Sequence, residues 1–243
     1  MAADTRKRLK LLASVRDMDE VDIVLDAGVD LIDMKEPSRG ALGAVDPPMI
    51  RDAVCRVNGR TLTSATIGDT PLPAAGLTER VRAIGDCGVD FVKIGLRMDQ
   101  QLEACLEALA PLARRYHLVA VWLADHGVPG DSEMADLATS DFAGAMLDTA
   151  DKSHGALPEL LSNREIAAFV TTSRRHGLLT GLAGSLRLSD IPGLAPFGAD
   201  YLGFRGGLCN GDRRGRLDPK QVRDAVLRIS DSGASAALPA TAS

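Results

Sequence analysis

The sequence predicts a single (β/α)8 barrel, and three observations lead to this fold class. Its 243 residues suit a one-domain barrel, which commonly has this length. Short apolar runs alternate with longer helical patterns from Leu9 onward, which is typical of parallel strands joined by helices. A Gly-x-Asp motif precedes an apolar strand at residues 28–30, 88–90 and 198–200. Because about eight strand–helix units can be counted, a closed barrel is favoured over an open doubly wound sheet.

The expected strands are apolar runs bounded by glycine or by polar residues that can cap a helix. In chain order they are Lys10–Val15, Leu31–Lys35, Leu62–Ile67, Phe91–Gly95, Val119–Ala124, Ala143–Thr149, Leu178–Ser185 and Tyr201–Arg205. Helices such as Gln101–Tyr116 and Asn163–His176 separate them. We therefore expect an N-terminal extension over residues 1–8, a barrel over 9–229 and, because its side chains are small or polar, a disordered tail over 230–243.

Composition indicates a protein that acts on small molecules. The net charge is −5 and the arginines are scattered among acids, which argues against a nucleic-acid partner. The four cysteines are far apart in sequence, without a metal-ligand spacing, which predicts reduced thiols and a cytoplasmic protein. No apolar run is long enough to cross a membrane and the start lacks a signal-peptide pattern. A homo-oligomer remains open.

Charged residues at the expected strand ends are the candidate catalytic groups, because barrel enzymes react at the C-terminal face. The sequence holds six lysines against 22 arginines, and three of the six fall at or just after strand ends. Lysine, unlike arginine, can lose its proton and attack a carbonyl to form a Schiff base. The candidates are Asp33, Lys35, Lys93, Asp125, Asp148 and Lys152. Structural ion pairs are the alternative interpretation of each group taken alone.

Two glycine-rich segments predict a phosphate site. Gly184-Ser185 closes the seventh strand, and Arg205-Gly206-Gly207 follows the eighth. Loops after these two strands commonly bind phosphate in this fold, because glycine lets an anion approach backbone N–H groups. Tight turns alone would also explain the glycines. The order of both loops favours phosphate binding, with Arg205 adding positive charge.

Several segments together resemble the (5-formylfuran-3-yl)methyl phosphate synthase family. They are Leu31-Ile-Asp-Met-Lys-Glu-Pro-Ser-Arg-Gly-Ala-Leu-Gly-Ala, Ser64-Ala-Thr-Ile-Gly-Asp, Phe91-Val-Lys-Ile-Gly-Leu, Met146-Leu-Asp-Thr-Ala-Asp-Lys, Leu182-Ala-Gly-Ser and Gly203-Phe-Arg-Gly-Gly-Leu-Cys. The resemblance runs from about Leu9 to Arg228. It implies condensation of two glyceraldehyde 3-phosphate molecules to a phosphorylated furan aldehyde, with loss of phosphate and water, in methanofuran-type cofactor biosynthesis. It implies no metal and no redox cofactor.

The resemblance also implies roles for individual residues. Lys35 is the expected Schiff-base lysine, and Asp33 would tune or deprotonate it. Lys93 and Lys152 would lower its pKa or carry protons, and Asp148 would act as acid or base during dehydration. One departure from the family pattern is Trp122, on the fifth strand before Asp125, which could narrow the pocket or pack outside the barrel.

Two other functions remain compatible with the residues. The first is another lysine-dependent barrel enzyme, such as a class I aldolase or a phosphosugar isomerase. The second is an inactive barrel that binds a phosphorylated metabolite and regulates a partner. The second leaves the three lysines at strand ends unexplained.

Overall fold

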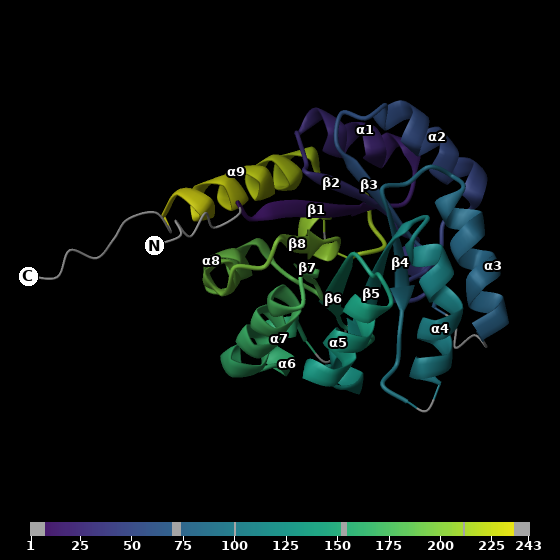
Figure 1. Ribbon diagram of the computed structural model, residues 1–243. Coiled ribbons are helices and arrows are strands. Elements are labelled where there is room, and N and C mark those ends of the chain that lie inside the picture. Colours follow the sequence, from purple (N-terminus) through teal and green to yellow (C-terminus); the bar gives the residue numbers. More distant parts are fainter. Residues whose placement is uncertain (1–7, 70–73, 100, 152–154, 211, 236–243) are drawn as a thin grey trace, which may run out of the picture.

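A computed structural model of the chain describes residues 8–69, 74–99, 101–151, 155–210 and 212–235 (Figure 1). Eight parallel strands form one closed barrel in sequence order, which confirms the predicted (β/α)8 fold. The strands are β1 (Lys10–Val15), β2 (Leu31–Met34), β3 (Leu62–Thr66), β4 (Phe91–Gly95), β5 (His117–Leu123), β6 (Gly144–Asp148), β7 (Leu179–Leu182) and β8 (Tyr201–Phe204). The seventh strand ends three residues earlier than expected, because Gly184 and Ser185 adopt positive φ angles of 109° and 50°.

Helices surround the barrel in Figure 1. The α-helices are α1 (Met18–Asp26), α2 (Pro47–Val57), α3 (Ala74–Gly85), α4 (Leu102–Ala113), α5 (Asp131–Thr139), α6 (Leu157–Leu160), α7 (Asn163–Arg175), α8 (Ile191–Leu194) and α9 (Pro219–Ser235). Short 3-10 turns include η1 (Pro37–Arg39), η2 (Ala124–His126), η4 (Leu188–Asp190), η5 (Ala195–Phe197) and η6 (Gly206–Leu208).

The C-terminal helix corrects one expected boundary. Disorder was expected from residue 230, but α9 continues to Ser235. One face of α9 is buried at helical spacing through Val222, Ala225 and Ile229. This apolar stripe packs the helix against the barrel as far as residue 229, directly before the segment expected to be disordered. The Ser230 hydroxyl donates to the Val226 carbonyl within the helix. Residues 236–243 of the expected tail, and residues 1–7 of the expected extension, lie outside the described residues.

The repeated Gly-x-Asp motif joins neighbouring strands at the N-terminal face of the barrel. Each aspartate precedes one strand and accepts a backbone N–H from the strand before it. The bonds are Asp30 to Leu11 (2.9 Å), Asp90 to Thr63 (2.7 Å) and Asp200 to Thr180 (2.9 Å). Asp90 and Asp200 also accept the hydroxyl of the same threonine. The motif therefore has a structural role, because it satisfies N–H groups at strand starts.

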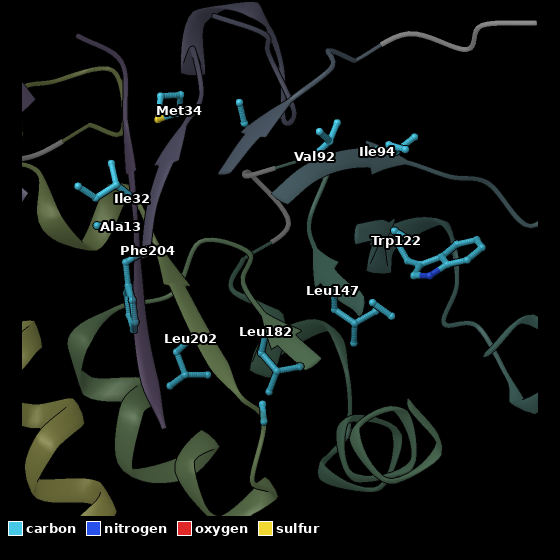
Figure 2. Packing of buried hydrophobic residues seen from close by; sticks show 14 of the residues in the cluster. Ala13, Ile32, Met34, Val92, Ile94, Trp122, Leu147, Leu182, Leu202 and Phe204 are labelled. Atoms are coloured by element: carbon cyan, nitrogen blue, oxygen red, sulfur yellow. The ribbon is translucent and has the colours of Figure 1, made fainter. Parts of the chain in front are cut away.

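Side chains alternate between two apolar layers along each strand. One layer, between strands and helices, includes Ile32, Met34 and Phe204 (Figure 2). The other fills the barrel interior and includes Leu12, Leu31 and Met146. Trp122 belongs to the outer layer and is 1% exposed, so it packs outside the barrel and does not narrow an interior pocket (Figure 2).

The structure has Cys55, Cys87, Cys105 and Cys209 as free thiols. Among the helices in the described ranges, none combines the length and apolar character needed to cross a lipid bilayer.

We predict that Asp200→Ala destabilises the barrel by about 1–3 kcal/mol, because it leaves the buried N–H of Thr180 without an acceptor. Urea unfolding followed by circular dichroism measures this change. Asp200→Asn is the matched control, since its amide oxygen can still accept the bond, and it should lose less stability. Equal stability of Asp200→Ala and the unmodified protein would contradict a structural role for the motif.

Candidate active site

Four charged side chains meet inside the C-terminal half of the barrel. Asp33 and Lys35 come from β2 and the residue after it, Lys93 from β4 and Asp148 from the end of β6. Each is at most 8% exposed, and Asp33 is fully buried. Asp33 and Lys35 are two residues apart, so they point to the same side, which is the barrel interior, while the intervening Met34 packs in the outer layer.

The four charges form two ion pairs that the sequence did not predict. Lys93 Nζ lies 3.0 Å from Asp33 Oδ2, and Lys35 Nζ lies 3.3 Å from Asp148 Oδ2. Each aspartate therefore pairs with a lysine from a different strand, although Asp33 was expected to act directly on Lys35. Asp33 also accepts hydrogen bonds from the hydroxyls of Ser14 (3.0 Å) and Ser64 (2.6 Å). These bonds hold its carboxylate in one orientation.

The environment shifts the pKa values of the Asp33–Lys93 pair in a direction useful for proton transfer. Burial lowers the pKa of Lys93, and the positive charge of Lys35 lowers it further, whereas Asp33 opposes the shift. Burial alone would raise the pKa of Asp33, but the charges of Lys93 and Lys35 and the Ser64 hydroxyl lower it overall. Asp33 thus stays ionised, while Lys93 loses its proton more easily than an exposed lysine.

Asp125 does not join this cluster. It lies in η2 after β5, and its two carboxylate oxygens accept the backbone N–H groups of Ala150 and Asp151, each at 2.7 Å. Burial raises its pKa, but these N–H bonds outweigh that effect and lower it. Its carboxylate holds the loop that follows Asp148, and a catalytic role for Asp125 stays a prediction. Lys152 lies outside the described residues.

The two glycine-rich loops face the same cavity as the lysines. A cavity of about 390 Å³ is lined by Lys35, Lys93, Asp148, both loops and Arg213. Gly207 brings the loops together, because a Cβ there would lie 2.6 Å from the Leu186 carbonyl oxygen. Among the described residues, the backbone N–H groups of Gly184, Ser185, Gly206 and Gly207 have no hydrogen-bond acceptor. Free N–H groups at a cavity wall suit an anion.

Arg205 does not have the phosphate-binding geometry expected from the sequence. Its guanidinium forms a buried bidentate pair with Glu20. The other N–H groups donate to the carbonyls of Ser14, Arg213 and Gly215 at 2.7–3.2 Å. All five N–H groups are thereby used, so none is left for a phosphate oxygen. Arg205 instead positions the loop that follows β8.

Two residues of this region escaped the sequence analysis. Glu20 is fully buried in α1, where its carboxylate anchors Arg205 and accepts the N–H groups of Arg16 and Leu217. Arg213 reaches the cavity wall from the loop before α9. Helix position alone could have marked Glu20 as an unusual acid on an apolar face. No sequence signal distinguishes Arg213 from its neighbours Arg214 and Arg216, because the loop conformation decides which one faces the cavity.

The described residues contain no cluster of three or more histidine, cysteine, aspartate or glutamate side chains able to hold a metal ion. The charged groups at the cavity are instead two lysine–aspartate pairs and several arginines. A lysine beside an aspartate can transfer protons or attack a carbonyl, and arginines beside backbone N–H groups can bind an anion.

Solved structures with a similar fold are barrel proteins of low sequence identity. One is phosphoribosyl anthranilate isomerase from Thermus thermophilus, with a TM-score of 0.64, 11% identity, and coverage of 91% of this chain and 98% of that one. Another is 3-hexulose-6-phosphate synthase from Salmonella typhimurium, with a TM-score of 0.65, 15% identity, and coverage of 90% and 99%. At these identities the likeness supports the barrel fold alone.

Sequence relatives are more specific. The family model described as 4-HFC-P synthase matches residues 11–226. A putative (5-formylfuran-3-yl)methyl phosphate synthase from Methylorubrum extorquens is 46% identical, covering 90% of this chain and 91% of the relative. The (5-formylfuran-3-yl)methyl phosphate synthase of Methanopyrus kandleri is 36% identical over 89% and 97%. The chain therefore belongs to the (5-formylfuran-3-yl)methyl phosphate synthase family of enzymes.

Proposed function

We propose that this synthase builds its furan product from two molecules of glyceraldehyde 3-phosphate through a Schiff base on Lys35. The single observation that carries the proposal is the pair of buried lysines, each beside an aspartate, which line one cavity together with the glycine-rich loops. An amine next to an anion site suits a phosphorylated aldehyde, because the amine can attack the carbonyl while the phosphate is held.

Lys35 is the better placed nucleophile of the two lysines. Both lysines line the cavity, but the side chain of Lys35 is 11% exposed and lies at the strand end, whereas that of Lys93 is 4% exposed and lies in the middle of its strand. In the proposed step the neutral Lys35 amine adds to the aldehyde carbon and forms a carbinolamine. Loss of the hydroxyl as water then gives the imine.

The neighbouring groups supply the proton transfers. Lys93 accepts the proton released when Lys35 becomes an amine, since burial and the charge of Lys35 lower the pKa of Lys93. The proton held by Lys93 returns through Asp148, 3.3 Å from Lys35, to the hydroxyl, which leaves as water, and the Asp148 carboxylate then takes a proton from the carbon next to the imine. Asp33 remains ionised and holds the ammonium form of Lys93 in place.

The atoms balance for this substrate. Two glyceraldehyde 3-phosphate molecules carry two phosphates, whereas the named product carries one. Conversion therefore expels one phosphate and two molecules of water, without net oxidation or reduction. Proton removal beside an imine allows elimination of an adjacent phosphate or hydroxyl, because the imine stabilises the negative charge that develops. The glycine-rich loops hold the phosphate of the substrate that reacts with Lys35.

We expect borohydride to trap a glyceraldehyde 3-phosphate adduct on the peptide that contains Lys35, as measured by mass mapping. Lys35→Ala should abolish the adduct and lower kcat by at least about 1,000-fold, because the nucleophile is removed. Lys220→Ala is the matched control, since Lys220 is exposed at the start of α9, and it should behave as the unmodified enzyme. A fully active Lys35→Ala enzyme would refute the assignment, and an adduct on Lys93 would exchange the two roles.

We predict that kcat/KM rises with pH and levels off below pH 10.5, the ordinary pKa of lysine. Below its lowered pKa Lys93 keeps its proton and cannot accept another, so the rate should fall about tenfold per pH unit on the acid side. Asp33→Asn removes the charge that favours protonated Lys93, so its pKa should fall further and the acid limb should move to lower pH.

The position of the acid limb is the decisive readout in this pH experiment, because the plateau rate would also report other effects of Asp33. Asp224→Asn on α9 is a control that changes the net charge equally. An acid limb that stays fixed or moves to higher pH in Asp33→Asn would exclude Lys93 as the proton acceptor.

A further inference from the structure

Arg213 connects the cavity to the chain segment that carries Lys35. Its Nη2 donates to the carbonyl oxygens of Pro37 (2.7 Å) and Gly40 (2.8 Å). Both carbonyls belong to residues 36–46, which follow Lys35 directly and which we call the β2–α2 loop. Arg213 and Pro37 also line the cavity. One guanidinium thus contacts both the cavity and the loop next to the proposed nucleophile.

The same guanidinium has donors to spare. Of its five N–H groups, the two on Nη2 bind the β2–α2 loop. The three on Nε and Nη1 have no acceptor in the part of the chain that the structure describes, since both side-chain bonds of Arg213 come from Nη2. The side chain is half-buried, so its conformational freedom is already reduced. A planar guanidinium with free, preoriented N–H groups is suited to bind a phosphate through two parallel hydrogen bonds.

The charged side chains that line two cavities at the C-terminal face indicate which cavity suits a phosphate. The cavity at Lys35 is lined by five basic side chains, Lys35, Lys93, Arg187, Arg205 and Arg213, and by two acidic ones, Asp148 and Asp212. A second cavity of about 580 Å³ on the side of β3–β5 is lined by Arg97 and His126 but also by Asp69 and Asp99. Lys35, Lys93, Arg187 and Arg205 are each paired with a carboxylate, whereas Arg213 forms no ion pair among the described residues, so an anion at the first cavity is drawn to Arg213.

The other arginines at the first cavity are less suited to the phosphate. All N–H groups of Arg205 are used by Glu20 and backbone carbonyls. The side chain of Arg187 is 66% exposed and its Nη1 lies 3.3 Å from Glu159. Arg213, in contrast, is held by two carbonyls before any ligand arrives, so binding restricts it less.

We propose that Arg213 binds the substrate phosphate through Nε and Nη1. Because Nη2 of the same side chain binds Pro37 and Gly40, the bound phosphate then also holds the β2–α2 loop in place next to Lys35. The loop is also fastened at Gly43, whose carbonyl accepts Glu36 N–H (2.9 Å) and the Thr66 hydroxyl (3.1 Å). A phosphate that immobilises the guanidinium therefore also fixes the loop at Pro37 and Gly40. This inference rests on the proposed function for the identity of the phosphorylated ligand.

The first test measures binding of inorganic phosphate by calorimetry at fixed ionic strength, without any reaction. Arg213→Met should weaken binding about 10- to 100-fold, the expected effect of losing a charge-assisted pair of hydrogen bonds. Arg214→Met is the matched control. It removes the same charge from the next residue, whose side chain does not line the cavity, and should change the Kd by less than about threefold.

The second test measures coupling between the phosphate and Lys35. Unphosphorylated glyceraldehyde is trapped on the enzyme with borohydride, with and without saturating inorganic phosphate. Phosphate should accelerate trapping at Lys35 in the unmodified enzyme and in Arg214→Met, but not in Arg213→Met. Arg213→Lys keeps the charge but has a single nitrogen, so it should bind phosphate better than Arg213→Met and still lose the acceleration.

The outcomes separate the inference from the proposed function. An unchanged phosphate Kd in Arg213→Met overturns the role of Arg213, as does an equal loss in Arg214→Met or a loss only in Arg187→Met. If no aldehyde is trapped on any lysine of the unmodified enzyme, the Schiff base fails, but the calorimetric comparison still decides phosphate binding. If Arg213→Met does not fold, Arg213→Lys replaces it, and acceleration by phosphate in that variant overturns the coupling.

Discussion

The buried charges of Asp33, Lys93, Lys35 and Asp148 set the main constraint on this molecule. Ionised groups inside a protein are costly unless each is paired and hydrogen-bonded, and removal of one partner leaves an uncompensated charge. The barrel meets this requirement by bringing β2, β4 and β6 to one level, where each lysine lies within 3.3 Å of an aspartate. Ser14 and Ser64 complete the bonding of Asp33. A hydrophobic layer of the same volume would serve stability as well, so the cluster points to catalysis.

The surrounding loops are built so that this cluster stays accessible from one side. Asp125 holds the loop after β6 through two backbone N–H bonds, and the Glu20–Arg205 pair holds the loop after β8. The side chains of Asp125 and Arg205 contact backbone groups and Glu20, and neither forms an ion pair with the lysines or aspartates of the cluster. Both act at a distance, because they fix the backbone that carries Asp148 on one side and Gly206-Gly207 on the other. Some polar residues near the cavity therefore line it, and others fix the backbone that carries the lining residues.

The opposite end of the barrel shows the same physical chemistry used for stability alone. The aspartates of the Gly-x-Asp motif accept N–H groups from the preceding strands. Burial, together with the charges of Asp200, Asp30 and Asp90, raises the pKa of Tyr201 to about 12, so the phenol in that half of the interior stays neutral. The N-terminal face thus uses carboxylates to bind strand-start N–H groups, whereas the lysine–aspartate pairs lie toward the C-terminal face.

The sequence by itself determined the barrel, the common side of Asp33 and Lys35, and the position of the glycine-rich loops, because these follow from strand periodicity and chain order. It also carried the family relationship. Only the structure shows that this common side is the interior. Only the tertiary structure decided that Asp33 pairs with Lys93, that Arg205 is fully engaged by Glu20, and that Arg213 faces the cavity. Those facts depend on contacts between residues far apart in sequence and on loop conformation. Local pattern contains no information about which of several like-charged side chains reaches a given partner.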